Sequence, residues 1–273
     1  MKTLYISDLD GTLLDRKGQL SERSEKTIRE LIHSGMLFSV ATARSQSAAG
    51  IISKLDIAVP GVLLNGVLMY DNTVKKYIDC VPMDTISAKK VMSVLRAFDR
   101  VSFVYKFDSD CGINVEFERL SNETEQNFFE VRKNTDYKSF RQTDKISVSE
   151  EDRVIYFTMV DRYERLFPIY NEISKIGGVK AALYRDNYTE MFFLEVFSSK
   201  ATKAAGVQKL KKMLNADRVV AFGDNINDIE MLSISDYGIA VGDAVEEVRE
   251  KADLVIGNSF DDGVANYLLS CKI

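Results

Sequence analysis

Short apolar segments alternate with amphipathic helical patterns in the first and last thirds of this 273-residue chain. Strands that are each followed by a helix pair in parallel, because the helix returns the chain to the edge where the strand began. The alternation therefore predicts an α/β fold in which helices cover both faces of a parallel sheet. The predicted strands are 3–7, 36–41, 62–64, 218–222, 238–241 and 253–256, and the predicted helices are 24–33, 46–55, 202–214 and 226–233.

The middle of the chain has a different pattern, with more aromatic and charged residues and with strands that follow one another directly. We interpret it as an α+β domain, residues 82–189, inserted into a parallel domain formed by residues 1–81 and 190–273. The region 118–142 is highly polar and predicts a surface helix, 123–132, followed by a loop. The other elements predicted in the middle of the chain are strands 101–107, 112–117, 154–160, 179–184 and 190–197, and helices 84–98 and 163–176.

The composition excludes several classes of function. A net charge of -5 argues against nucleic acid or an anionic membrane as the main partner. The single histidine, His33, lies near the end of a predicted helix, so we expect a structural role and no histidine-rich metal site. Cys80, Cys111 and Cys271 are widely spaced, which predicts free thiols in a reducing compartment. Charged residues near the start of the chain leave no signal-peptide pattern, so we expect a cytoplasmic protein.

Polar side chains follow the predicted strands, at the edge where parallel strands end together. Asp8 and Asp10 follow the first strand, and alternation places both on one side of it. Two carboxylates about 4 Å apart repel by about 4 kcal/mol at an effective dielectric constant of roughly 20, so this pair requires a compensating cation, proton or reaction. Open parallel sheets bind ligands beyond the carboxyl ends of their strands. The polar residues at the other strand ends are Thr42, Arg44, Asn65, Asp224, Asn225, Asn227 and Asp228.

Each of these groups also has a structural explanation. Thr42, Asp224 and Asn225 are residues that cap helices, and Asn65-Gly66 is a sequence typical of a hairpin turn. Because all of them fall at the same edge of one sheet, their coincidence favours a ligand site.

Four segments of the chain, in order, resemble the signatures of the haloacid dehalogenase superfamily, and within it the Cof-type phosphatases with an inserted α/β cap. Ala43 and Ala204 stand where that family more often has glycine, and neither difference removes a functional side chain. Lys200 competes with Lys203 for the third signature, and the spacing from the helix start favours Lys203. The four segments are DLDGTLL at 8–14, ATAR at 41–44, SSKATKAAGV at 198–207 and GDNINDIEML at 223–232.

This resemblance implies a Rossmann-like core domain, a cap that reads the substrate, and hydrolysis of a phosphate monoester. Asp8 is the expected nucleophile, giving an aspartyl-phosphate. Asp10 is the expected general acid and then the general base. Thr42, Asn65 and Lys203 are expected to bind the phosphate.

The resemblance also implies Mg²⁺ as the cofactor, bound by Asp8, by the backbone carbonyl of Asp10 and by Asp224. Asn227 and Asp228 are expected to support the ion through hydrogen bonds or water, and Arg44 to contact substrate. The implied partner is a small phosphorylated metabolite, foremost a sugar phosphate.

Two other functions stay open at this point. Relatives with a similar cap are phosphomutases, and a phosphorylated aspartate can also serve as a signalling switch. Asp10 argues against a switch, because a lasting acyl phosphate requires that no hydrolytic base lies beside it. The side chains of the cap that read a substrate are not identified by the sequence; the candidates are Tyr105, Arg119, Tyr184, Arg185 and Tyr188. The oligomeric state is likewise not indicated.

Overall fold

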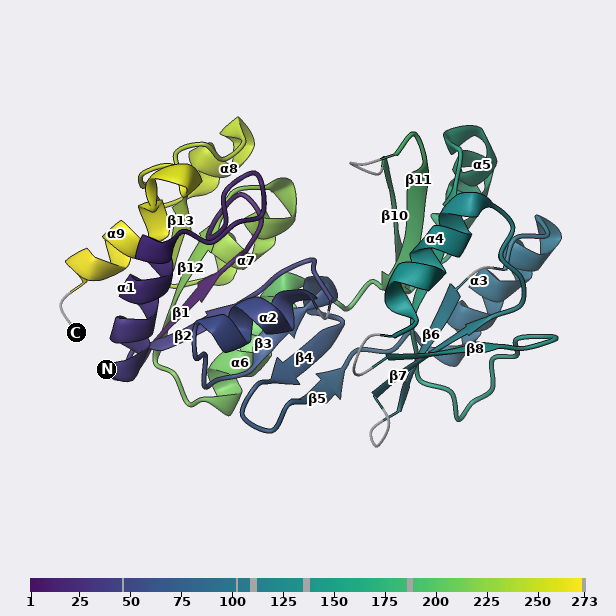
Figure 1. Cartoon of the computed structure of the whole chain (residues 1–273), viewed down its shortest axis with the longest axis horizontal. Helices are drawn as coiled ribbons and strands as arrows, with labels where there is room; N and C mark the ends of the chain where they lie inside the picture. The colour runs from purple at the N-terminus through teal and green to yellow at the C-terminus, as the bar shows by residue number, and fades with distance from the viewer. Residues whose placement is uncertain (46, 102, 109–111, 135–137, 186–188, 272–273) are drawn as a thin grey trace. The chain divides into compact units, whose positions relative to one another are not determined.

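The computed structural model divides the chain into two compact units, Met1–Asp79 with Ala201–Ile273 and Cys80–Lys200 (Figure 1). It describes every residue except 46, 102, 109–111, 135–137, 186–188 and 272–273, and it describes only the backbone of residues 47–49. Cys111 and Tyr188, which were named above, and the first residue of the predicted helix 46–55 therefore lie outside the described residues.

A five-stranded parallel sheet, in the order β14-β13-β12-β1-β2, forms the centre of the first unit and confirms the α/β prediction. In β1, which lies between β12 and β2, Ser7 lies opposite Phe222 on one side and Val40 on the other. Because these strands end in register, the residues that follow them meet at one edge of the sheet. The strands are β1 (Thr3–Ser7), β2 (Leu37–Val40), β12 (Arg218–Gly223), β13 (Tyr237–Ala240) and β14 (Leu254–Val255).

Helices follow the strands of this unit as the alternation predicts. Ser21 caps the first helix by accepting a hydrogen bond from the Ser24 N–H, and the helix ends at His33. The first and last helices, α1 and α9, lie against each other (Figure 1). The helices are α1 (Glu22–His33), α2 (Ser47–Lys54), α6 (Lys203–Met213), α7 (Ile229–Ile234), α8 (Glu246–Lys251) and α9 (Gly263–Ser270), with short 3₁₀ turns η1 (Leu64–Gly66), η2 (Ile226–Asp228) and η3 (Ser259–Asp261).

A second, three-stranded sheet of this unit was not predicted in full. Only β3 (Gly61–Leu63) was expected, and it was predicted as a strand of the parallel sheet, which it meets through an isolated bridge between Ala41 and Val62. It pairs instead in antiparallel fashion with β4 (Leu68–Asp71), which is followed in the sheet by β5 (Lys76–Cys80). Asn65-Gly66 forms the 3₁₀ turn η1 between β3 and β4, with Asn65 in the left-handed region at φ 52°.

The second unit is a mixed α+β layer structure with a six-stranded sheet in the order β10-β11-β9-β6-β7-β8. Its strand β11 pairs over its whole length with β10, and also with β9, so the unit extends past residue 189, where the sequence analysis placed its end. The strands are β6 (Phe103–Asp108), β7 (Gly112–Phe117), β8 (Lys138–Gln142), β9 (Val154–Asp161), β10 (Val179–Arg185) and β11 (Phe192–Ser198). The helices are α3 (Thr85–Ala97), α4 (Glu123–Arg132) and α5 (Tyr163–Ile173).

Strand β8 corrects the prediction of a loop after residue 132. It lies at the edge of the sheet and pairs in parallel with β7, while most of its side chains are exposed. An edge strand with few buried residues has no apolar alternation, so no local pattern indicates it.

Helices pack on both faces of the second unit's sheet. On one face, α3 and α5 enclose an apolar core that includes Val91, Leu95 and Ile169 together with Phe157 of β9. On the other face, Phe128 of α4 packs against Phe103, with ring centroids 4.8 Å apart.

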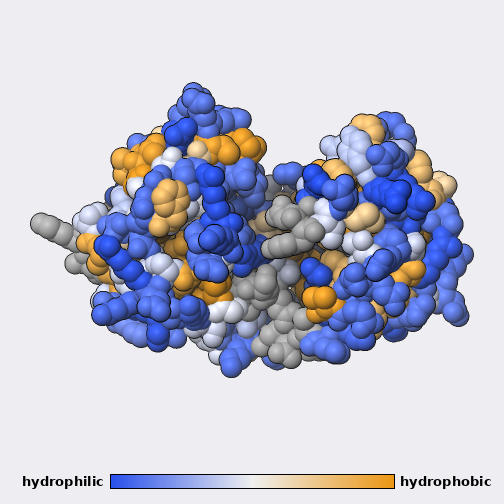
Figure 2. Space-filling view, turned by 45° about the horizontal axis from the view of Figure 1, so that its top comes forward, coloured by the Kyte–Doolittle hydropathy of each residue, from blue (hydrophilic) through white to orange (hydrophobic). Residues whose placement is uncertain are grey.

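The surface of the protein is mostly hydrophilic in the view of Figure 2, with separate hydrophobic patches. Single exposed apolar side chains such as Phe260 are common on globular proteins. Among the described residues, no helix has the length and apolar character needed to cross a membrane.

Candidate active site

Three buried side chains meet at the carboxyl edge of the parallel sheet. The Lys203 Nζ donates to Asp8 Oδ1 at 2.6 Å and to Asp228 Oδ1 at 2.6 Å. Asp8, Lys203 and Asp228 are 5%, 2% and 0% exposed. A lysine held between two carboxylates at this depth is a strong electrostatic feature, since little solvent screens it.

The local structure explains why these three residues meet. Asp8 directly follows β1, and its N–H donates to the carbonyl of Phe222 on β12 at 3.0 Å. Lys203 is the first residue of α6, where Thr202 caps the helix by accepting from the Ala205 N–H. Asp228 ends the 3₁₀ turn after β12, and its Oδ2 accepts from the N–H groups of Asp224 and Asn225, each at 3.1 Å.

Asp224 is a fourth charged member of the group, and it is only partly buried. The hydroxyl of Thr12 donates to its Oδ1 at 2.9 Å. Gly11, at φ +79°, passes so close that a Cβ there would lie 2.5 Å from Asp224 Oδ2. The turn after Asp10 therefore requires glycine, both for its left-handed backbone and to leave room for the carboxylate.

The pKa values of these acids are raised because negative charge is concentrated where solvent is scarce. Burial, with Asp228 and Asp224 nearby, raises the pKa of Asp8 to about 7 although Lys203 acts to lower it. Burial also raises the pKa of Asp224 to about 6 against the opposing hydrogen bond from Thr12. For Lys203, burial favours the neutral amine, but Asp8 and Asp228 outweigh it and raise its pKa.

The cluster fits a divalent cation bound by oxygen. Asp8, Asp224 and Asp228 each offer a carboxylate oxygen, and these oxygens all lie within 4.8 Å of one another. Three ionised carboxylates against one ammonium leave two negative charges, and burial together with the neighbouring carboxylates raises the pKa values of Asp8 and Asp224. An oxygen-only donor set of this charge suits Mg²⁺.

Asp228 differs from the other two acids because both of its carboxylate oxygens already accept hydrogen bonds. One accepts from Lys203 and the other from two backbone N–H groups. Within the described residues no hydrogen bond reaches Oδ2 of Asp8 or Oδ2 of Asp224, so Asp228 is the acid whose two oxygens are both engaged.

Thr42 and Asn65 lie at the neighbouring strand ends, in loops that are tied together. Thr42 is 1% exposed, and the Asn65 N–H donates to its carbonyl at 3.0 Å. The Asn65 Oδ1 accepts from the Asn227 side chain at 3.2 Å, which links this loop to the turn after β12. Gly66 packs on the start of α6, where a Cβ would lie 2.1 Å from the carbonyl of Thr202. The loops of three strands and the start of α6 thus form one edge.

Asp10 and Arg44 form a pair of their own. Arg44 Nε donates to Asp10 Oδ2 at 2.7 Å, and its Nη2 donates to Asp10 Oδ1 at 2.5 Å. Asp10 is therefore not a member of the buried carboxylate group, although only Leu9 separates it from Asp8.

The structure thus brings Asp8, Asp224, Asp228 and Lys203 together, and it places the competing Lys200 in an exposed turn. Sequence reasoning missed the role of Thr12 as a donor to Asp224. Its position two residues after Asp10, inside the DLDGT segment, was the available signal.

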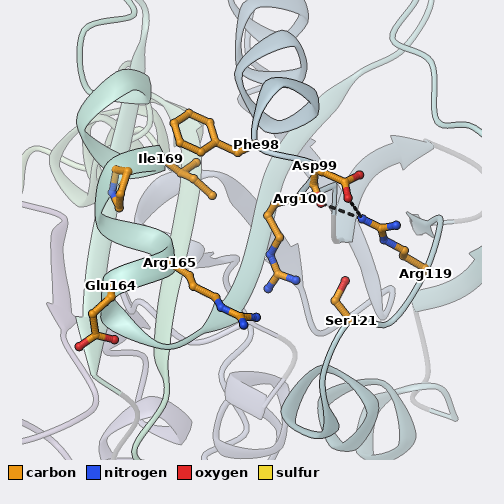
Figure 3. Close-up of a pocket in the computed structure, with 9 residues that line it drawn as sticks. Phe98, Asp99, Arg100, Arg119, Ser121, Glu164, Arg165 and Ile169 are labelled. Atoms are coloured by element: carbon orange, nitrogen blue, oxygen red, sulfur yellow. Dashed lines mark hydrogen bonds and ion pairs between the residues drawn. The ribbon is translucent and has the colours of Figure 1, made fainter.

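A cavity of about 600 Å³ lies wholly within the second unit, between the end of α3 and the start of α5 (Figure 3). Three arginines line it, and each one is paired with a carboxylate. Arg119 turns toward Asp99, while Arg100 and Arg165 both pair with Asp161. The charges there are balanced, in contrast to those of the carboxylate cluster.

The cap residues named from the sequence have different environments. Tyr105 is buried in the sheet, Arg185 pairs with Glu190, and Tyr184 is 45% exposed. Arg119, as the cavity showed, is engaged with Asp99.

Comparison with known proteins is consistent with this geometry. Residues 5–268 match a family described as haloacid dehalogenase-like hydrolase. The chain is 24% identical to 5-amino-6-(5-phospho-D-ribitylamino)uracil phosphatase YitU of Bacillus subtilis, over 97% of this chain and 96% of that protein. It is also 24% identical to pyridoxal phosphate phosphatase YbhA of Escherichia coli, over 99% of each. The crystal structure of a haloacid dehalogenase-like hydrolase from Bacteroides thetaiotaomicron has a TM-score of 0.75 at 21% identity, and the match covers 98% of this chain and 99% of that one.

Proposed function

The chain belongs to the haloacid dehalogenase-like hydrolases and is a phosphatase, and we propose that it hydrolyses small phosphorylated metabolites, foremost sugar phosphates, with Mg²⁺ and through an aspartyl-phosphate on Asp8. The observation that carries this proposal is the buried cluster in which Lys203 lies 2.6 Å from both Asp8 and Asp228. The cytoplasm is the expected location, as the sequence analysis indicated.

Asp8 supplies the nucleophile. Its Oδ1 is held by Lys203, which fixes the side chain and favours its ionised form, while Oδ2 has no hydrogen bond within the described residues. In the first step a bond forms between Oδ2 and phosphorus as the bond from phosphorus to the ester oxygen breaks. The leaving oxygen takes that electron pair and accepts a proton from Asp10.

The second step returns Asp8 to its starting state. Asp10, now ionised, takes a proton from a water molecule as the water oxygen attacks phosphorus. The bond between Asp8 and phosphorus then breaks, and inorganic phosphate is released. A base beside the aspartyl-phosphate favours turnover over a lasting signal.

Cations and hydrogen-bond donors have to offset the charge of the phosphoryl group during both steps. Lys203, the Thr42 hydroxyl and the Asn65 amide are the donors we assign to the phosphoryl oxygens. Asp8, the carbonyl of Asp10 and Asp224 would hold Mg²⁺, with Asp228 acting through Lys203 and water and Asn227 through Asn65. Bound Mg²⁺ supplies positive charge that orients the phosphate and neutralises it.

The substrate class is proposed from similarity. The two relatives compared above act, by their names, on small phosphorylated molecules. One of these is a phosphorylated ribityl compound, which favours sugar phosphates and related esters in a substrate panel.

The test is phosphate release from a panel of phosphorylated metabolites with Mg²⁺, for the wild-type chain, for Asp8→Asn and for Asp79→Asn. Asp79 lies in the same unit and pairs with Lys209 near the surface, so its variant is the matched control. We expect activity in the wild type and the control, and its loss in Asp8→Asn and in EDTA. Release that survives in Asp8→Asn would contradict the nucleophile.

A phosphomutase would give a different result in the same assay. It would convert a sugar phosphate to its isomer in the presence of a bisphosphate and release little free phosphate. Product analysis of the same reactions therefore separates the two activities.

A further inference from the structure

Arg44 holds both carboxylate oxygens of Asp10. The two N–H···O distances, 2.7 Å and 2.5 Å, come from Nε and Nη2 of one guanidinium, which is the forked arrangement that planar Arg–carboxylate pairs adopt. The side chain of Asp10 is 53% exposed, whereas that of Arg44 is 26% exposed. A carboxylate this exposed has little packing of its own to fix its rotamer, so the fork is its main described restraint.

The backbone of Arg44 is itself fixed. Its N–H donates to the Thr42 hydroxyl at 3.1 Å, and its carbonyl accepts from the Leu64 N–H at 3.0 Å. The guanidinium therefore starts from an anchored strand end between two loops of the candidate site.

Gly18 leaves room for the pair. It has φ +73°, and a Cβ there would lie 2.9 Å from Arg44 Nη2 and 3.9 Å from Asp10 Oδ1. The turn that carries Gly18 is closed by hydrogen bonds between Asp15 and Gln19 and between Gly18 and Asp15. The arginine fork is thus covered on one side by a glycine that cannot be enlarged without disturbing it.

We propose that Arg44 is a positioning residue that aims the carboxyl group of Asp10 at the leaving oxygen, rather than a contact for the substrate. The inference rests on the proposed function, because it assigns Arg44 a role in the step that Asp10 performs. Small errors in the placement of a catalytic group cost about 100-fold in rate.

The leaving group distinguishes the two roles of Arg44. A nitrophenolate leaves without a proton, so p-nitrophenyl phosphate does not require the general acid in the first step. A sugar alkoxide does require it. A residue that acts through Asp10 is therefore needed to form the aspartyl-phosphate from the alkyl ester and dispensable for forming it from the aryl ester. The second step, in which Asp10 is the base, is common to both esters, so the comparison uses kcat/KM, which reports the first step. A residue that binds the phosphate or steers the substrate is needed for both.

The experiment measures kcat and KM of wild type, Arg44→Gln and Arg44→Lys with p-nitrophenyl phosphate and with the sugar phosphate turned over fastest in the panel. We expect Arg44→Gln to lower kcat/KM for the sugar phosphate by about 30- to 100-fold and for p-nitrophenyl phosphate by less than about 3-fold. Arg44→Lys keeps the charge but loses the fork, so an intermediate loss is expected.

A double-mutant cycle with Asp10→Asn completes the test. When Asp10 can no longer transfer a proton, Arg44→Gln should cause no further loss of kcat with the sugar phosphate, within about 2-fold. Additive losses would overturn the inference, because they would show that Arg44 acts independently of Asp10.

The other outcomes are also decisive. Equal losses of kcat/KM on both esters would make Arg44 a substrate contact and overturn the inference. Unchanged or faster turnover of the sugar phosphate by Arg44→Gln would also overturn the inference. A wild-type chain inactive on both esters would instead refute the proposed function, which is a separate result.

Discussion

Each of the two units buries a group of opposite charges, and the two groups differ in how completely the charge is satisfied. In the second unit, Arg100 pairs with Asp161, and its Nη2 lies 3.7 Å from Glu125. Arg165 also pairs with Asp161, at 3.6 Å, so two arginines face two carboxylates. Asp161 also accepts from the Arg162 N–H at 2.8 Å, and Glu125 accepts from the Ser121 N–H at 2.6 Å. Each carboxylate there has donors for its charge.

In the first unit, Asp8 and Asp228 share one lysine with Asp224 beside them, and burial raises the pKa values of Asp8 and Asp224 to about 7 and about 6. The two groups have similar ion-pair geometry but opposite consequences. A balanced buried pair holds a fold together, whereas an unbalanced one stores repulsion that a bound cation relieves. Charge balance, more than the number of ion pairs, therefore indicates which cluster is the site of chemistry.

The largest effect is expected from Lys203→Met. It removes the donor to Asp8 and Asp228, so activity should fall by about 1,000-fold. It also leaves two buried carboxylates without their cation, which should lower the free energy of unfolding by about 3–5 kcal/mol in the absence of metal. Phosphate release and urea unfolding check the two parts. Lys200→Met is the matched control, and an equal loss there would contradict the assignment.

Arg100→Leu tests the balanced group. It should lower the free energy of unfolding by about 3 kcal/mol, because Asp161 and Glu125 lose a buried cation. Turnover of p-nitrophenyl phosphate by the folded fraction should stay within about 3-fold of wild type, because this cluster takes no part in the chemistry. A large loss of kcat without a loss of stability would remove the distinction between the two groups.

The dependence of stability on pH sharpens the comparison further. Burial and neighbouring charge raise the pKa values of Asp8 and Asp224 above their values in the unfolded chain, so the metal-free folded state binds more protons. Their contribution to stability is therefore fully present below about pH 4 and is lost as the pH rises through about 6 to 7. Mg²⁺ relieves that repulsion, so it should raise the melting temperature more at about pH 7.5 than at about pH 5.5.

Thermal unfolding in Mg²⁺ and in EDTA at these pH values is the measurement. In Asp224→Asn, the difference in melting temperature between Mg²⁺ and EDTA should rise less steeply with pH than in the wild type. A difference that is the same at every pH would show that the two acids do not bind the ion.

The smallest effect is expected at the surface pair of Arg185 and Glu190. Both side chains are largely exposed, at 59% and 94%, so solvent screens their attraction. Arg185→Ala should leave the melting temperature unchanged within experimental error, as differential scanning calorimetry would show. A clear drop would mean that exposed pairs of this unit contribute to its stability.

Comparison of prediction with structure shows where sequence patterns lose their information. The parallel strands were found because buried strands are apolar runs bounded by turns, as in Thr3–Ser7. The helix predicted at 123–132 has the same bounds in the structure, because Asn122 caps it. Strand β8 was missed, since its position depends on the neighbour β7 and not on its own mostly exposed residues.

The sequence by itself determined the kinds of groups at the site: two aspartates after one strand, a second acidic cluster after another, and a lysine at the start of a helix. These follow from local rules, because strand ends, caps and glycine turns are written in neighbouring residues. Tertiary structure alone decided which groups meet. It placed Lys203 between Asp8 and Asp228 and joined Asp10 to Arg44. Partners this far apart in the chain are chosen by strand order and register, which depend on the packing of the whole sheet.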